Sequence, residues 1–327
     1  MLTRDQLHRA AGEMGFPADS IEKVGMLVRL LNLAVAHPFL GPRIALKGGT
    51  ALNLFVFDLP RLSVDIDLNY IGAADRATML VERPKIDRAL EQVVGRLGLT
   101  VKRLPSEHAG GKWRLSYTSA LGRPAVLEVD VNFLLRTPLW PTVRRDSITF
   151  VEERARAITV LDEHELAAGK FAALLARGAS RDLFDSRELL RRSSMDVEKL
   201  RLGFVVYGGI NRIDWRTVST EAVTTTAVDV QRQLLPMLRR EVRPAPADVE
   251  SWTAALVEET RDLLGALLPL TEEEMVFLGR LNEDGEIQPE LLTADVALQE
   301  RLRAHPGLRW KALNVKEHSA RSRSGRG

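Results

Sequence analysis

The sequence contains no cysteine among its 327 residues. This absence excludes disulfide bonds, thiolate metal ligands and a cysteine nucleophile, and it is compatible with a reducing cytoplasm. The chain also lacks any run of about 18 uncharged apolar residues, so we expect no membrane span. Residues 1–16 are polar and lack the apolar core of a secretory signal. We therefore expect a cytoplasmic protein.

No charge of one sign dominates the chain, whose formal net charge is +2. A nucleic-acid partner is therefore not indicated by bulk charge and would have to rest on local basic clusters. Hydrophobic residues make up 45% of the sequence, which is typical of a globular protein, and the length favours two domains.

Hydrophobic periodicity changes character along the chain. The first half predicts helices and strands in mixture, with helices at 2–15, 18–36, 50–56 and 75–97 and strands at 43–46, 63–70, 99–104, 113–118, 125–133 and 157–160. The second half predicts helices at 162–176, 181–192, 196–206, 226–240, 247–267, 271–283 and 290–303. We expect an α+β fold with a mixed-sheet domain (1–155), a mainly helical domain (156–318) and a disordered basic tail (319–327).

Two aspartates, Asp65 and Asp67, alternate with apolar residues in the strand predicted at 63–70. Side chains two apart on a strand share one face, roughly 6.6 Å from each other along it. A divalent cation relieves the repulsion between such carboxylates, and Mg²⁺ or Mn²⁺ accepts them together with phosphate oxygens. A solvent-facing strand with two surface acids is the alternative, since an isolated Asp-x-Asp is common.

A glycine turn, Gly48-Gly49-Thr50, separates an apolar strand from the next helix. Glycine lets a backbone approach a ligand closely, and the N–H groups at a helix start attract phosphate. The alternative is a tight strand-to-helix turn that binds no ligand, since it would have the same residues. Arg61 and Ser63, just before the acidic strand, are further candidates for nucleotide contacts.

A third acid is expected on the strand at 125–133, where Glu128, Asp130 and Asn132 share a face. If this strand lies beside 63–70, one of its acids completes a three-carboxylate cluster that binds metal and helps deprotonate an attacking hydroxyl. We favour Asp130 as the third acid, with Glu128 as the alternative. A solvent-exposed strand without a functional role is a further interpretation.

The first helices of the second half carry Lys170, Asp182 and Asp185. Lys170 would supply a point charge for a triphosphate, although helix statistics favour a surface lysine. Ser180 is a candidate N-cap, and a position in the first helical turn is a sufficient structural reason for Asp182.

The glycine turn and Asp-x-Asp together resemble the signature of DNA polymerase β-like nucleotidyltransferases. Four ordered blocks are similar to the AbiEii/AbiGii (MenT-like) toxin family: LKGGTALN, RLSVDIDL, LEVDVNF and ELAAGKFAALLARGASRDLFD. They span residues from about 44 to 187, and together they are more specific than any one alone. Thr50 stands where the superfamily often has serine, which keeps the hydroxyl.

The resemblance implies a metal-dependent toxin with a cognate antitoxin that adds NMP from an NTP to the 3′ end of tRNA. It implies a polymerase β-like lobe followed by a helical lobe. The roles it implies are phosphate binding by Gly48, Gly49, Thr50 and Lys170, metal binding by Asp65 and Asp67 (with Asp130 as third ligand from the strand argument), and completion of the site by Asp185 or Asp182.

The acceptor is less constrained than the chemistry. Basic clusters at 187–192, 239–240 and 309–326 are candidates for RNA contacts or for solvated helix faces. The same motifs would serve a nucleotidyltransferase acting on a protein or a small molecule. A non-catalytic binding module is the third interpretation, and the intact set of motif residues argues against it.

Overall fold

A mixed seven-stranded sheet forms the centre of the first part of the molecule, in the order β3-β4-β5-β2-β1-β7-β6. The computed structural model describes residues 2–104, 110–192 and 195–324. They divide into unit 1 (Met1–Asp162 and Gln231–Ala247) and unit 2 (Glu163–Val230 and Asp248–Gly327). Each unit is described by itself.

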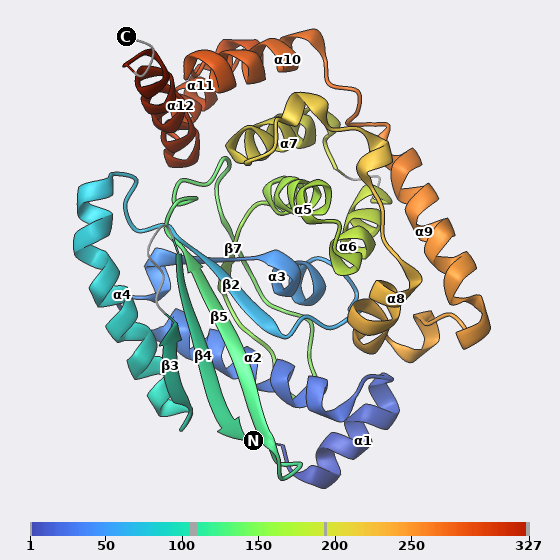
Figure 1. Cartoon of the computed structure of the whole chain (residues 1–327). Helices are drawn as coiled ribbons and strands as arrows, with labels where there is room; N and C mark the ends of the chain where they lie inside the picture. The colour runs from blue at the N-terminus through green and yellow to red at the C-terminus, as the bar shows by residue number, and fades with distance from the viewer. Residues whose placement is uncertain (1, 105–109, 193–194, 325–327) are drawn as a thin grey trace. The chain divides into compact units, whose positions relative to one another are not determined.

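Unit 1 carries all the strands of the sheet. Those strands are β1 (Ile44–Lys47), β2 (Asp65–Tyr70), β3 (Thr100–Leu104), β4 (Gly110–Thr118), β5 (Pro124–Asn132), β6 (Val143–Arg145) and β7 (Ile158–Val160). β2 runs parallel to β5 and antiparallel to β1, and β4 pairs antiparallel with both β3 and β5. The sheet therefore places β2 and β5, far apart in sequence, side by side at its centre (Figure 1).

In the described part of unit 1, four α-helices accompany the sheet: α1 (Arg4–Met14), α2 (Ala18–Ala36), α3 (Gly48–Phe55) and α4 (Arg76–Arg96). α1 begins with a capping box between Thr3 and Gln6 and ends at Gly15, whose φ of 71° suits glycine. α2 buries its apolar stripe completely at Ile21, Val24 and Leu27. α2 and α4 pack against each other and against the sheet (Figure 1).

Unit 2 is helical in the residues that the structure describes. Its longer helices are α5 (Glu163–Arg177), α6 (Ser180–Leu190), α7 (Val197–Ile210), α9 (Val249–Leu264), α10 (Glu272–Gly279), α11 (Val296–Ala304) and α12 (Pro306–Ser324). α5 packs against α6 and α7, and α6 packs against α9. None of the helices in the described ranges is both long enough and apolar enough to span a bilayer.

The predicted α+β class is confirmed, with differences in detail. The helix predicted at 226–240 is instead a short α8 (Ala227–Asp229), a π-turn (Val230–Leu234) and two 3₁₀ turns (Leu235–Met237 and Arg240–Val242). Pro236 explains part of this, since proline removes a helical N–H donor. Residues 231–247 belong to unit 1, whereas the sequence placed them in the helical domain.

The tail expected to be disordered from 319 onward is helical up to Ser324, within α12. An established helix extends at little cost because each further residue adds one hydrogen bond. Residues 325–327 lie outside the described part of the chain.

Candidate active site

The two acidic strands pair in a register that aligns their acids. Asp65 lies opposite Glu128, and Asp67 lies opposite Asp130. Residues paired in this way on adjacent strands point to the same face of a sheet. The two strands are therefore neighbours, as a three-carboxylate cluster requires. Asp65, Asp67 and Asp130 share one face, and each is half-buried.

The glycine turn approaches this face at Gly48, the first residue of α3. Gly48 has φ +73°, and a Cβ built there would lie 2.2 Å from Oδ2 of Asp67. Only glycine fits, because a side chain would be strained and would collide with the carboxylate. The glycines lie inside the first helical turn, so their N–H groups have no acceptor within the helix, and the N-cap Lys47 supplies no side-chain cap.

Arg61 and Ser63 converge on the second glycine of the turn. A Cβ at Gly49 would lie 2.9 Å from Nη2 of Arg61 and 2.8 Å from Oγ of Ser63. Arg61 is buried (2% exposed), and its Nη1 donates to the carbonyl of Leu62 at 2.8 Å. A guanidinium, a hydroxyl and helix-start N–H groups thus gather at one turn, which is a donor set suited to phosphate.

Thr50 has a different role from the one expected of its hydroxyl. The side chain is fully buried, and its hydroxyl donates to the backbone carbonyl of Asp65. This bond ties α3 to the start of β2. A phosphate contact from this residue would therefore come from its backbone N–H.

Two lysines extend the acidic row across the sheet. Lys112 on β4 lies opposite Asp130, and Lys47 on β1 lies opposite Asp67, which gives the row Lys112, Asp130, Asp67, Lys47. Burial raises the pKa of Asp130, and Asp67 and Glu128 raise it further, against the lowering effect of the two lysines. A carboxylate with a raised pKa is better suited to accept a proton than an ordinary aspartate.

Glu128 is held differently from Asp130. Its carboxylate pairs with Lys112 at 2.6 Å and with Arg114 at 3.4 Å. The hydrogen bond to Glu128 raises the pKa of Lys112. Because Glu128 already has two cationic partners, the geometry favours Asp130 as the third acid.

The acidic face is suited to a metal that is shared with a substrate. Among the described residues, no group of three or more acids or histidines could hold a metal ion by itself. Asp67 raises the pKa of Asp130 by charge repulsion, which a cation would relieve. Mg²⁺ commonly takes one or two carboxylates plus phosphate oxygens, so the aspartates fit an ion that arrives with a triphosphate.

In unit 2, Lys170, Asp182 and Asp185 form one buried cluster. Lys170 Nζ lies 2.8 Å from Oδ1 of Asp182 and 3.0 Å from Oδ2 of Asp185. Arg177 Nε lies 2.6 Å from Oδ2 of Asp182. The side chains of Lys170, Asp182 and Asp185 are 8%, 3% and 0% exposed. Lys170 is therefore a buried, paired cation on α5 rather than a surface lysine, and both aspartates of the motif contact it.

The pKa of Asp182 shows the balance within this cluster. Burial alone would raise it, but Lys170 and Arg177 lower it to about 2. Ser180 does not cap α6 as expected, because the N-cap is Ala179 and the serine hydroxyl donates to the carbonyl of Asp229. From the sequence, a place in the first helical turn is sufficient reason for Asp182. The structure adds buried ion pairs with Lys170 and Arg177.

Sequence reasoning missed Lys47 and Lys112 as neighbours of the acidic pair. Lys47 directly precedes the glycine turn, which is a usable signal, whereas Lys112 is placed only by strand pairing. The basic cluster at 187–192 consists of paired residues: Arg187 contacts Glu188, Arg191 contacts Glu259 and Arg192 contacts Glu163.

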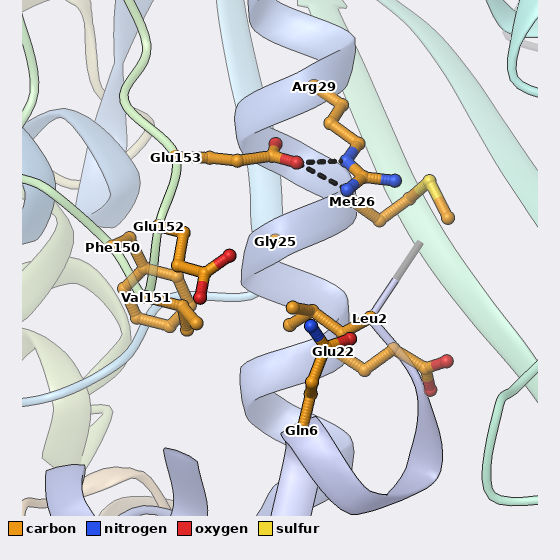
Figure 2. Close-up of a pocket in the computed structure, with 10 residues that line it drawn as sticks. All are labelled: Leu2, Gln6, Glu22, Gly25, Met26, Arg29, Phe150, Val151, Glu152 and Glu153. Atoms are coloured by element: carbon orange, nitrogen blue, oxygen red, sulfur yellow. Dashed lines mark hydrogen bonds and ion pairs between the residues drawn. The ribbon is translucent and has the colours of Figure 1, made fainter.

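Figure 2 shows a separate pocket in unit 1, lined by α1, α2 and residues 150–153. Arg29 and Glu153 form an ion pair beside it. None of the predicted site residues lines it.

Residues 29–255 match the protein family described as nucleotidyl transferase AbiEii toxin, type IV TA system. None of the curated proteins matches the sequence. Among solved structures, the chain is similar to MenT4, a nucleotidyltransferase toxin from Mycobacterium tuberculosis H37Rv, with 19% identity and a TM-score of 0.57. The alignment covers 94% of this chain and 99% of that chain. At this identity the structural likeness shows a shared fold.

Proposed function

This chain belongs to the family of AbiEii nucleotidyl transferase toxins of type IV toxin–antitoxin systems, and from that premise we propose that it adds NMP from an NTP to the 3′ end of RNA, with tRNA as the acceptor. The family match includes the glycine turn, both acidic strands, α5 and α6. The observation that carries the proposal is the register that sets Asp67 beside Asp130, with Gly48 against the Asp67 carboxylate.

Asp65 and Asp67 are the proposed ligands of Mg²⁺. An ion held there with the NTP would supply positive charge to the triphosphate and to the pyrophosphate leaving group. The alternation of β2 supports this assignment, because it holds both carboxylates on one face while Ile66 and Leu68 anchor the strand in the core.

The glycine turn is the proposed phosphate site. Backbone N–H groups of Gly49 and Thr50, the guanidinium of Arg61 and the hydroxyl of Ser63 would donate to phosphate oxygens. These donors fix the triphosphate before the acceptor attacks. Positioning of this kind accounts for most of the catalysis in phosphoryl-type transfer.

Asp130 is the proposed proton acceptor. The oxygen of the RNA 3′-hydroxyl attacks the α-phosphorus, its proton passes to the Asp130 carboxylate, and the bond to pyrophosphate breaks. The raised pKa of Asp130 supports this role, because an ordinary aspartate is a weaker base.

Lys170 enters the proposal through the family resemblance, as a cation for the nucleotide phosphates. Its contacts with Asp182 and Asp185 hold the ammonium in a fixed position. These carboxylates are therefore proposed to orient Lys170.

The acceptor is tested by incubating the protein with each α-³²P-labelled NTP, Mg²⁺ and total RNA or total protein from a bacterial lysate. We expect label at the 3′ end of tRNA, removable by a 3′ exonuclease. Label on protein or on a small molecule would replace RNA as the acceptor. If no fraction is labelled, the result would contradict nucleotide transfer and favour the interpretation as a non-catalytic binding module.

A further inference from the structure

A distant segment of unit 1 is bound to the loop that carries Arg61. Residues 235–243, here named the strap, follow about 170 residues after that loop. The N–H of Leu62 donates to the carbonyl of Met237 at 2.8 Å, and the N–H of Arg239 donates to the carbonyl of Pro60 at 3.2 Å. Between these two bonds, Arg61 and Leu238 form an antiparallel bridge.

Further hydrogen bonds hold the strap, one set within it and one to the residue that ends α1. Leu238 is fully buried, and its carbonyl accepts from Nε and Nη2 of Arg243 at 3.0 and 2.8 Å. The N–H of Arg240 donates to the carbonyl of Gly15 at 3.0 Å. The strap is therefore joined both to the end of α1 and to the Arg61 loop.

The loop needs such a restraint because its backbone is strained. Leu59 has φ +49°, a conformation that a leucine adopts only when its surroundings impose it. Arg61 and Ser63 follow within four residues and reach the Gly49 turn. Anything that holds residues 60–62 thus also sets where the Arg61 guanidinium lies.

We propose that the strap is a positioning element for nucleotide binding: residues 237–239 hold Pro60–Leu62 so that Arg61 and Ser63 face the phosphate site at Gly49. The inference rests on the proposed function of that site. It adds that NTP affinity depends on backbone hydrogen bonds from a segment that lies outside the four sequence blocks of the nucleotidyltransferase resemblance.

Arg239→Pro tests this by breaking the contact between residue 239 and Pro60. Arg239 has φ −61° and Leu238 has ψ 149°, both compatible with a proline at 239. The substitution removes the N–H that reaches the carbonyl of Pro60 and places the ring Cδ against that carbonyl. Arg239→Ala is the matched control, because it removes the same guanidinium but keeps the N–H. Dissociation constants for a non-hydrolysable NTP analogue with Mg²⁺ are measured by calorimetry, without an acceptor.

We expect Arg239→Pro to weaken NTP binding by about tenfold relative to Arg239→Ala, an effect of the size expected for losing one hydrogen bond. In an Arg61→Ala background the same substitution should have a smaller effect, because one of the two groups that the strap positions is gone. Equal affinities for the proline and alanine variants, or an undiminished effect without Arg61, would overturn the inference.

Arg243→Gln provides a second variant should the proline variant not fold, since it removes the side chain that holds Leu238; it should weaken NTP binding in the same Arg61-dependent way. An unchanged affinity in that variant would count against the strap. Wild-type protein that binds the analogue but labels no acceptor contradicts the proposed transfer alone, whereas wild-type protein that binds no nucleotide contradicts both.

Discussion

At Gly48 the backbone lies close to the proposed metal ligand Asp67. The positive φ of Gly48 and the 2.2 Å separation between a built Cβ and Oδ2 of Asp67 are two independent reasons for glycine. They can be separated experimentally, because Gly98 has a similar φ of +68° with nothing within 4 Å of its built Cβ.

Gly48→Ala and Gly98→Ala should each cost about 1 kcal/mol of unfolding free energy from backbone strain. Only Gly48→Ala should also displace Asp67 and abolish most nucleotide transfer. Chemical denaturation and a transfer assay on both variants provide the measurement. Full activity in Gly48→Ala would mean that the turn does not shape the acidic face.

Asp182 gives a residue-level prediction about stability. Its pKa is about 2 in the folded protein against an ordinary value of 3.8, so it stabilises the folded state above pH 4. That contribution disappears as pH falls from about 4 to 2, where the carboxylate gains a proton. The depression corresponds to roughly 2 kcal/mol.

Wild-type protein should therefore be more stable than Asp182→Asn near pH 6, and the difference should shrink as pH falls toward 2. Denaturant unfolding of both proteins across this range measures it. A difference that stays constant with pH would show that the ion pairs with Lys170 and Arg177 do not stabilise the fold.

At the level of elements, β5 presents two acids on one face in different electrostatic settings. Glu128 is paired with Lys112 and Arg114, while burial and Asp67 raise the pKa of Asp130. Glu128→Gln is thus a natural control for Asp130→Asn on the same strand.

Asp130→Asn should lower the transfer rate roughly 100-fold, which is typical for removal of a general base. Glu128→Gln should have a much smaller effect. Burial, the largest cause of the raised pKa of Asp130, also predicts that the wild-type rate falls, on acidification, at a higher pH than an ordinary aspartate would give, because a protonated carboxyl accepts no proton. This acidic limb should be missing in Asp130→Asn, and the opposite ranking of the two variants would contradict the assignment.

The helices and strands also show which features of the fold the local sequence pattern predicts. The stripe of Ile21, Val24 and Leu27 predicted α2 with its observed ends at 18 and 36, and alternation predicted β2 and β5 to within two residues. Sequence alone does not establish that β2 pairs with β5, since a strand's neighbour depends on non-local contacts. The 3₁₀ and π turns near Pro236 were missed because their apolar spacing resembles that of a helix.

At the level of the whole molecule, the two units are not continuous in sequence, because residues 231–247 return to unit 1. A change of composition near residue 155 marks the start of the helical part but carries no sign of this return. The candidate groups were found from short motifs, whereas their partners Lys47, Lys112 and Met237 were identified only through strand pairing and long-range hydrogen bonds.

The most direct test of the account is transfer of label from α-³²P-NTP to purified tRNA by the full chain, with and without Mg²⁺, compared with Asp65→Asn and Asp67→Asn. The account predicts metal-dependent labelling by the wild-type protein and a loss of at least about 100-fold in each variant, with folding and thermal stability retained. Undiminished labelling by a folded Asp67→Asn variant would contradict it.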